Sequence, residues 1–364
     1  MQSHRRFFPC WAAVAAVFQI VLFSGLFYRA EAQATSNLPE SIAKANALTD
    51  LSGVGPYELH ARIVINPGTK HAQQGEVTIY RDQTRSRIEL QLEDFHQVEV
   101  VGEGTRYVSR SRPYPLAGLD VLNSVEDAVQ LRPEYLRDKF KKHSRTVGGV
   151  PASCFNFKFQ FSKVSYCFDD STGTALEVSN SSGWRGRFSG YTAVGEKSFP
   201  TKIELTQPGV PRDVQLSEIH VTGRKFDDTN FAAPQGARAF PVCNGRTATW
   251  ASWDFDWGTS ATENGEVYVY AIVEADGSVH DLTVFGGQYR WMEKEVSKIT
   301  HRWRFLPALC GSTAITSEAV WPLRRMDWNP GESGPVSWGG EGHTPSQSDF
   351  RTYYPPDAAN IYRW

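Results

Sequence analysis

Polar and apolar residues alternate along most of the chain from Tyr57 to residue 222. In a strand, successive side chains point to opposite faces of the sheet, so this period of two predicts antiparallel strands with one buried face. Short polar breaks separate the alternating segments, which lie at residues 57–65, 75–82, 86–94, 96–104, 105–111, 154–160, 163–169, 175–180, 184–192, 199–206 and 213–222.

Two segments depart from this alternation. In residues 117–143, Leu119, Leu122 and Val125 recur at helical spacing and Pro133 interrupts the pattern. We expect two short helices there, covering the sheet, because proline ends or kinks a helix. Residues 33–55 are small and polar, and predict a lead-in with one helical turn.

The pattern changes again after residue 262. Residues 265–273 and 279–284 alternate and flank a turn at Asp276-Gly277. Apolar residues then recur at i, i+4, i+7 and i+11, which is one face of a helix. Pro307 ends that helix, and residues 314–325 supply a last strand. The helical stripe consists of Met292, Val296, Ile299 and Trp303.

The N-terminus has the features of an export signal. Arg5 and Arg6 precede an apolar run to Tyr28, and Ala30-Glu31-Ala32 provides a small-residue cleavage site. We therefore expect cleavage after Ala32 and a periplasmic protein. The alternative is an uncleaved inner-membrane anchor at residues 7–28, because the run approaches the length that spans a bilayer.

Export makes disulfide bonds plausible for the four cysteines beyond the signal. If Cys154 lies opposite Cys167 in a hairpin, Phe155 opposes Tyr166 and Phe157 opposes Val164. The apolar side chains then share one face and both cysteines share the other, so the register is self-consistent. We predict a Cys154–Cys167 bridge. Cys243 and Cys310 are the remaining pair, and the sequence leaves open whether they are bridged or free.

Composition and motifs argue against several classes of protein. The formal net charge is −2 and no basic block stands out, so nucleic acid is not expected as a partner. Among the common signatures, no nucleophile elbow, phosphate-binding loop or zinc-ligand spacing is present. We expect no cofactor, no metal site and no catalytic residue, and hence a protein that is not an enzyme.

The first module resembles the LolA-like periplasmic lipoprotein carriers. The likeness covers about residues 50–237 and depends on strand order, on FPTKIEL at 199–205 and on the exit DTNFAAPQGA at 228–237. It implies a concave antiparallel half-barrel, in which family members enclose an acyl-chain cavity. A lipid ligand is therefore an alternative to a filled core here.

The second module resembles the TonB C-terminal domain over about residues 263–326. That likeness implies a small ββαβ unit whose exposed strand edge binds a TonB-dependent outer-membrane transporter. Pro322 in the last strand and the lack of a long Pro-rich spacer depart from the family. The matching positions are Gly265, Val267, Asp276, Gly277, Val279, Trp303, Phe305, Pro307, Ala308 and Gly311, and the edge would present Ile315, Ser317, Ala319 and Trp321.

Together these patterns predict an α+β fold, a large antiparallel β half-barrel with a helical insert followed by a small ββαβ domain. The function expected first is an exported, non-enzymatic protein that binds an envelope protein through a strand edge. The alternative is a periplasmic lipid or lipoprotein carrier, and a membrane-anchored TonB energy transducer is the third. The expected parts are a signal peptide (1–32), a lead-in (33–55), a LolA-like domain (56–237), an aromatic linker (238–262), a TonB C-terminal-like domain (263–326) and an irregular Gly/Pro/aromatic tail (327–364).

Overall fold

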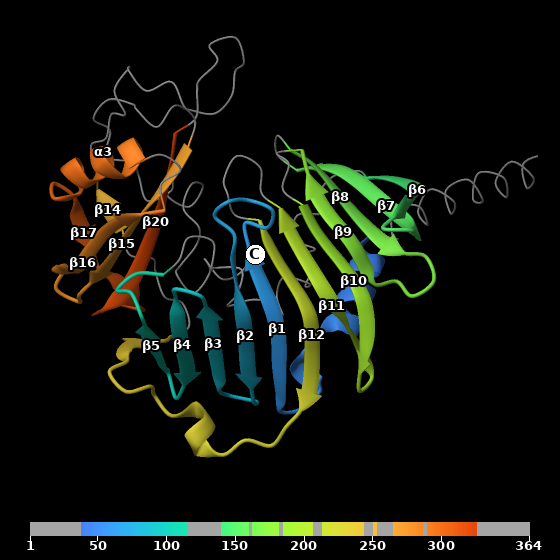
Figure 1. Ribbon diagram of the computed structural model, residues 1–364, viewed down its shortest axis with the longest axis horizontal. Helices are drawn as coiled ribbons and strands as arrows, with labels where there is room; N and C mark the ends of the chain where they lie inside the picture. The colour runs from blue at the N-terminus through green and yellow to red at the C-terminus, as the bar shows by residue number, and fades with distance from the viewer. Residues whose placement is uncertain are drawn as a thin grey trace, which may run out of the picture.

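The structure is a computed structural model of the 364-residue chain, dominated by one large antiparallel sheet (Figure 1). The residues that it describes are 38–115, 140–159, 162–181, 185–206, 213–243, 250–252, 265–286 and 290–325. The predicted signal peptide or anchor, the tail and most of the predicted helical insert lie outside these ranges. Within them, no helix is long and apolar enough to cross a membrane.

The large sheet has thirteen strands in the order β13-β5-β4-β3-β2-β1-β12-β11-β10-β9-β8-β7-β6. It consists of two meanders, β1–β5 and β6–β12, whose outer members β1 and β12 pair in the middle. The strands are β1 (Tyr57–Ile65), β2 (Gln73–Arg81), β3 (Ser86–Leu92), β4 (His96–Gly102), β5 (Thr105–Arg110), β6 (Lys141–Val147), β7 (Val150–Phe159), β8 (Ser162–Asp169), β9 (Ala175–Asn180), β10 (Arg185–Val194), β11 (Lys197–Thr206), β12 (Val214–Gly223) and β13 (Arg238–Pro241).

One face of this sheet, here called the inner face, packs against the N-terminal helix. Residues 38–49 are helical, and the 3-10 helix η1 (Leu51–Gly53) follows with Asp50 as its N-cap. Leu38, Ile42 and Ala45 recur at i, i+4 and i+7 and are fully buried in the main core. The lead-in therefore forms a longer helix than the single turn that we predicted. Its apolar residues lie on one face of the helix, but they are few among many small and polar residues, so the helical period is weak in the sequence.

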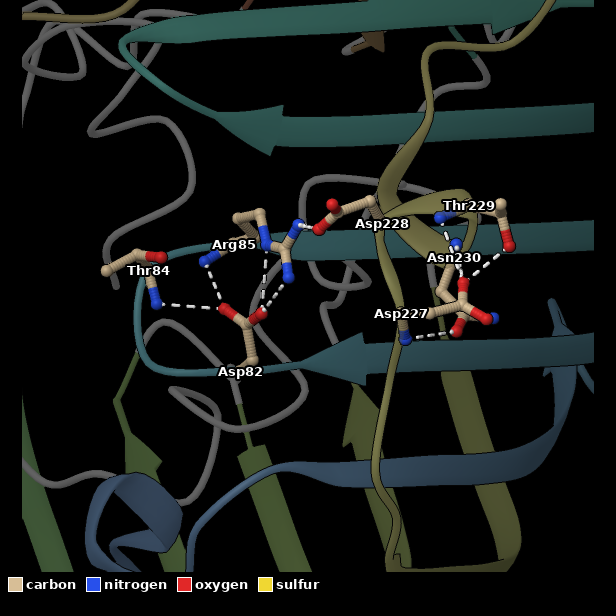
Figure 2. Close-up of polar contacts among 7 residues, drawn as sticks. All are labelled: Asp82, Thr84, Arg85, Asp227, Asp228, Thr229 and Asn230. Carbon is tan, nitrogen blue, oxygen red and sulfur yellow. Dashed lines mark hydrogen bonds and ion pairs between the residues drawn. The ribbon is translucent and has the colours of Figure 1, made fainter.

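The opposite, outer face holds the segment that leaves β12. Asp227 caps the 3-10 helix η4 (Asp228–Phe231), and the side-chain oxygen of Asn230 accepts a hydrogen bond from the backbone N–H of Asp227. Arg85, in the turn after β2, binds both Asp82 and Asp228, the latter at 2.7 Å, as Figure 2 shows. Its guanidinium also lies 4.4 Å from the ring centroid of Phe231. These contacts fix the exit motif to the sheet and lead the chain to β13, beside β5.

The C-terminal module consists of a three-stranded sheet, a helix and two short ribbons. Its sheet has the order β16-β15-β20, and α3 packs on one face of it. The ribbons are β14 with β17 and β18 with β19. The elements are β14 (Trp250–Ser252), β15 (Gly265–Val273), β16 (Val279–Phe285), α3 (Arg290–Thr300), β17 (Arg304–Leu306), β18 (Ala308–Cys310), β19 (Thr313–Ile315) and β20 (Ser317–Arg325).

The predicted fold class, α+β with a half-barrel and a compact ββαβ domain, is wrong. The structure is mostly β, with a large open antiparallel sheet and few helices. In the C-terminal module, the three short strands β17, β18 and β19 lie between α3 and β20. The sequence missed them because segments of three residues are too short to show a period.

Strand β6 was also missed. Residues 141–143 belonged to the expected helical insert, but Lys141–Val147 pairs with β7 at the end of the sheet. Six of its seven residues are exposed, so no polar–apolar alternation marks it. The two helices expected in residues 117–143 otherwise lie outside the described residues.

Both cysteine pairs form disulfides in the structure. Cys154 is bonded to Cys167 and Cys243 to Cys310. The register of β7 and β8 pairs Phe155 with Tyr166, as the sequence predicted. Cys154 and Cys167 lie together on the outer face, in a small cluster with Ala152. The first bridge thus links β7 to β8 near the end of the sheet, and the second links the segment after β13 to β18.

Gly75 allows a close approach of β2 and β3. A Cβ atom there would lie 1.9 Å from the backbone oxygen of Gln91, so the strands would have to move apart. We expect Gly75→Ala to lower the free energy of unfolding by about 1–3 kcal/mol, as overpacking does. Urea denaturation measures this. Gly223→Ala is the control, because nothing lies within 4 Å of its Cβ position. Equal stability of the two variants would contradict the crowding.

Candidate functional site: the inner face of the large sheet

An apolar surface covers the inner face from β3 across to β7. Strand register places the apolar residues of each strand on this side, where they form the main core cluster. Its central part is aliphatic and its β7–β11 end is aromatic. The aliphatic members include Leu59, Ile63, Val77, Ile79, Leu90, Ile203 and Leu216, and the aromatic members at the β7–β11 end are Phe155, Phe157, Tyr166, Phe168, Phe188 and Phe199.

The aromatic end is organised by ring contacts between β7 and β8. Phe157 stacks on Tyr166 with ring centroids 5.7 Å apart, and Phe155 meets Phe168 edge-on at 5.9 Å. Val164 lies opposite Phe157 in the register and is partly buried against the same cluster. Such rings present a large apolar surface with few rotatable bonds, which suits contact with a flexible apolar chain.

The other end of the inner face, on β4 and β5, is polar. Ile88 pairs with Glu99, and Glu99 with Val108, so Glu99 faces the same side as the apolar core. Arg106 and Arg110 are two residues before and after Val108 in β5, so their side chains also lie on the inner face. The C-terminal module sits on this end through an apolar cluster of Val108, Phe240, Tyr268, Tyr270, Ile272 and Phe285.

A buried ion network lies inside this contact. The carboxylate of Glu318, in β20, accepts hydrogen bonds from Arg106 Nη1 at 2.7 Å and from Arg110 through both of its Nη atoms. Tyr270 donates its hydroxyl proton to Glu318 Oε1 at 2.8 Å. Arg106 also binds Glu99 at 2.7 Å. The network therefore joins strands of the two modules.

Electrostatics hold Glu318 in its charged form and Tyr270 in its neutral form, through shifts of their pKa values. The side chains of Arg106, Arg110, Glu99 and Glu318 are all 12% exposed or less. Burial alone would raise the pKa of Glu318, but the two arginines more than offset it and the pKa lies well below the ordinary value. Burial and the nearby Glu318 carboxylate raise the pKa of Tyr270. Two cations and two anions balance here, so the network is a neutral joint between the modules.

Two features characterise the chemistry of the described residues. Among them, no group of three or more potential metal ligands is present. The buried charges are paired with one another, as structural ion networks are. The remaining candidate for a binding site is the apolar inner face, whose side chains form one buried cluster.

The structure places the family-motif residues in structural positions. Gly277 has φ 84° in the turn after β15, where Asp276 accepts a hydrogen bond from the backbone of Ser278 at 2.8 Å. Trp303 and Phe305 pack beside each other, with centroids 6.2 Å apart, in the core under α3. Pro307 lies between β17 and β18. It does not end the helix as predicted, because α3 already ends at Thr300 and β17 lies between them.

The predicted partner edge is divided between two strands. Ile315 ends β19, which pairs with β18, whereas Ser317, Ala319 and Trp321 belong to β20. All four side chains are buried, and β20 pairs with β15 along its length. Partner binding through this edge stays a prediction.

Sequence reasoning missed the ion network. The signal was Arg106 and Arg110 at two positions of β5 that share a face with Val108, where a buried face should be apolar. No such sequence signal identifies Glu318 as buried, because a single acidic residue in a strand usually faces water.

Comparisons with known proteins give fold neighbours only. No family model and no curated protein matches the chain. A solved structure of a LolA superfamily protein from Nitrosomonas europaea matches with a TM-score of 0.36 and 12% identity, over 53% of this chain and 96% of that one. A putative outer-membrane lipoprotein-sorting protein domain from Vibrio parahaemolyticus matches with a TM-score of 0.32 and 12% identity, over 52% and 94%.

MucB matches over a longer stretch, with a TM-score of 0.31 and 14% identity over 69% of this chain and 78% of that one. The first of these neighbours belongs to the superfamily that the first module resembles in sequence. None of the three is a TonB C-terminal domain, and the expected domain has no support. With TM-scores below 0.5, these likenesses support no statement about function.

Proposed function

We propose that this protein is a non-enzymatic periplasmic carrier that binds the acyl chain of a lipid or lipoprotein against the inner face of its large sheet. The observation that supports it is the apolar character of that whole face, whose side chains form one buried cluster with an aromatic end on β7–β11. Transfer of an acyl chain from water to such a surface is favourable at about 0.8 kcal/mol per buried methylene group.

The dimensions of the N-terminal helix add to this proposal. Its twelve helical residues, 38–49, span about 18 Å, whereas thirteen strands at about 4.8 Å spacing make a sheet roughly 60 Å broad. In Figure 1 the helix (blue) crosses behind β10–β12. It holds the sheet by the apolar contacts of Leu38, Ile42 and Ala45 and by a hydrogen bond from Lys197 to the carbonyl of Ala47. A ligand chain laid beside this helix would extend the same apolar packing.

The first test is native mass spectrometry of the protein purified from its own envelope fraction. We expect an adduct of lipid mass on the chain. The second is titration of the purified protein with a neutral pyrene-labelled fatty alcohol, followed by fluorescence. No adduct together with no saturable binding of the alcohol would refute the proposal.

A pair of neighbouring residues on β8 makes the titration specific. Val164 faces the apolar cluster, and Lys163 points from the outer face and is exposed. We expect Val164→Glu to weaken binding of the alcohol about ten-fold or more, because a charge is then placed against the apolar chain. Lys163→Glu should leave binding unchanged. Circular dichroism checks that both variants fold, and equal effects would contradict an inner-face site.

A further inference from the structure

The outer face of β6–β10 carries a dense group of exposed cationic side chains, here called the basic face. Register places them together, because Lys158 pairs with Lys163, and Arg187 pairs with Glu177, which in turn pairs with Cys167. These side chains therefore lie on the same face of the sheet as Cys154 and Cys167, which is the face opposite the apolar core. The basic face consists of Lys141, Arg145, Lys158, Lys163, Arg185 and Arg187, all exposed.

Few carboxylates oppose these six cations. Glu177 lies at the centre and is buried, and Asp169 ends β8 and accepts hydrogen bonds within its own turn from Ser171 and Thr172. Glu204 lies opposite Arg187 in β11, but it is paired with Lys202 at 2.5 Å. Six positive charges against Glu177 and Asp169 therefore leave four positive charges on strands β6–β10. The whole chain has a formal net charge of −2, so the surplus is local.

The remainder of the outer face is balanced by pairs. On β1 and β12, Arg62 binds Glu218 at 3.0 Å, and Arg224 binds Glu58. On β3, Arg87 binds Glu89 at 2.5 Å. The surplus of positive charge is therefore confined to the half of the sheet that ends in β6.

Glu177 fixes the arrangement of the arginines. Its carboxylate contacts Arg145 at 2.5 Å, Arg187 at 3.0 Å and Arg185 at 3.9 Å. Arg145 also lies 3.2 Å from the sulfur atoms of both Cys154 and Cys167. Burial works to raise the pKa of Glu177, but hydrogen bonds from Arg187 and Arg145 hold the pKa below its usual value. One buried anion thus holds three half-exposed guanidinium groups at the surface.

We infer that the basic face docks on an anionic phospholipid surface. Its cations lie on four of the five adjacent strands β6–β10, which together are about 20 Å across. The residues beneath them include the buried Ala152, Cys154 and Cys167. A broad, positively charged sheet face complements an array of head-group phosphates, and each basic residue near such a surface adds to the attraction. An extended acidic peptide would contact only one row of these cations.

The inference is tested by co-sedimentation of the mature chain with vesicles of phosphatidylcholine alone or with about 30% phosphatidylglycerol. We expect binding to the anionic vesicles and its loss at high salt, because exposed charges are screened. No binding of the wild-type chain to anionic vesicles would overturn the inference. So would equal binding to both kinds of vesicle, or binding of poly-glutamate alone.

Charge reversal locates the surface. The double variant Lys158→Glu/Lys163→Glu should weaken vesicle binding about ten-fold or more. The control is Lys294→Glu/Lys298→Glu on α3, which makes the same change in net charge at exposed positions away from the basic face. Equal loss in the two variants would show that only net charge matters and would overturn the inference.

The inferred docking surface and the proposed acyl-chain site can be refuted independently of each other. Val164→Glu should bind anionic vesicles like the wild type, whereas Lys158→Glu/Lys163→Glu should still bind the pyrene-labelled alcohol. Loss of vesicle binding in Val164→Glu would mean that vesicles are held through the inner face, against the docking surface inferred here.

Discussion

Replacing Glu318 with alanine is expected to lower the free energy of unfolding by about 3–5 kcal/mol, the usual effect of removing one partner of a buried ion network. The side chains of Arg106 and Arg110 are 12% and 5% exposed and would lose their shared carboxylate. Tyr270 would lose its hydrogen-bond acceptor as well. The two modules would then meet across uncompensated positive charge.

Urea denaturation, followed by tryptophan fluorescence and far-UV circular dichroism, measures this loss. Trp303 and Trp321 are buried in the C-terminal module, so fluorescence reports on that module. We expect the fluorescence transition to move to lower urea first. The control is Glu295→Ala on α3, whose exposed pair with Lys298 should be worth less than about 1 kcal/mol. A Glu318→Ala variant as stable as this control would show that the network does not hold the modules together.

Removal of the Cys243–Cys310 bridge is expected to cost about 4 kcal/mol in the chain-entropy model, because it closes a long loop of the unfolded chain. The two cysteines are 67 positions apart in sequence. The bridge joins the segment just after β13, which is part of the large sheet, to β18 in the C-terminal module. It therefore restrains the same pair of modules as Glu318.

The comparison is a Cys243→Ala/Cys310→Ala variant against Cys154→Ala/Cys167→Ala, both measured by urea denaturation without reductant. The second bridge spans 13 positions, and its removal should cost about 3 kcal/mol in the same model. The long-loop variant should also show the larger change in fluorescence of the C-terminal module. A greater loss from the short loop would mean that local packing, with Arg145 against both sulfur atoms, outweighs loop closure.

The strands of the large sheet could largely be predicted from sequence, because burial on one face imposes a period of two. β1, for example, begins and ends at the predicted residues, and the Phe155–Tyr166 register follows from the same rule. β6 has no buried face and so left no pattern. The short strands β17–β19 are held by their surroundings rather than by their own sequence.

The candidate site was harder to predict. The apolar inner face follows from strand alternation, but the network at its end joins residues far apart in sequence, such as Arg110 and Glu318, 208 positions apart. No local pattern encodes such a contact. The motif likeness after residue 262 led instead to a partner edge, whose four side chains the structure buries.

The pairing of β1 with β12 has a consequence for folding. Tyr57 pairs with Gly223 and Ile65 with Val214, so the middle of the sheet closes only when most of the first module is available. Each meander has sequential neighbours and can form early, whereas this seam carries the entropy cost of a long loop. Because the chain is synthesised from its N-terminus, β1 is complete before β12 and has one edge unpaired until β12 is available. An unpaired edge invites pairing with other chains, so this seam is the place where a holding chaperone would be needed most.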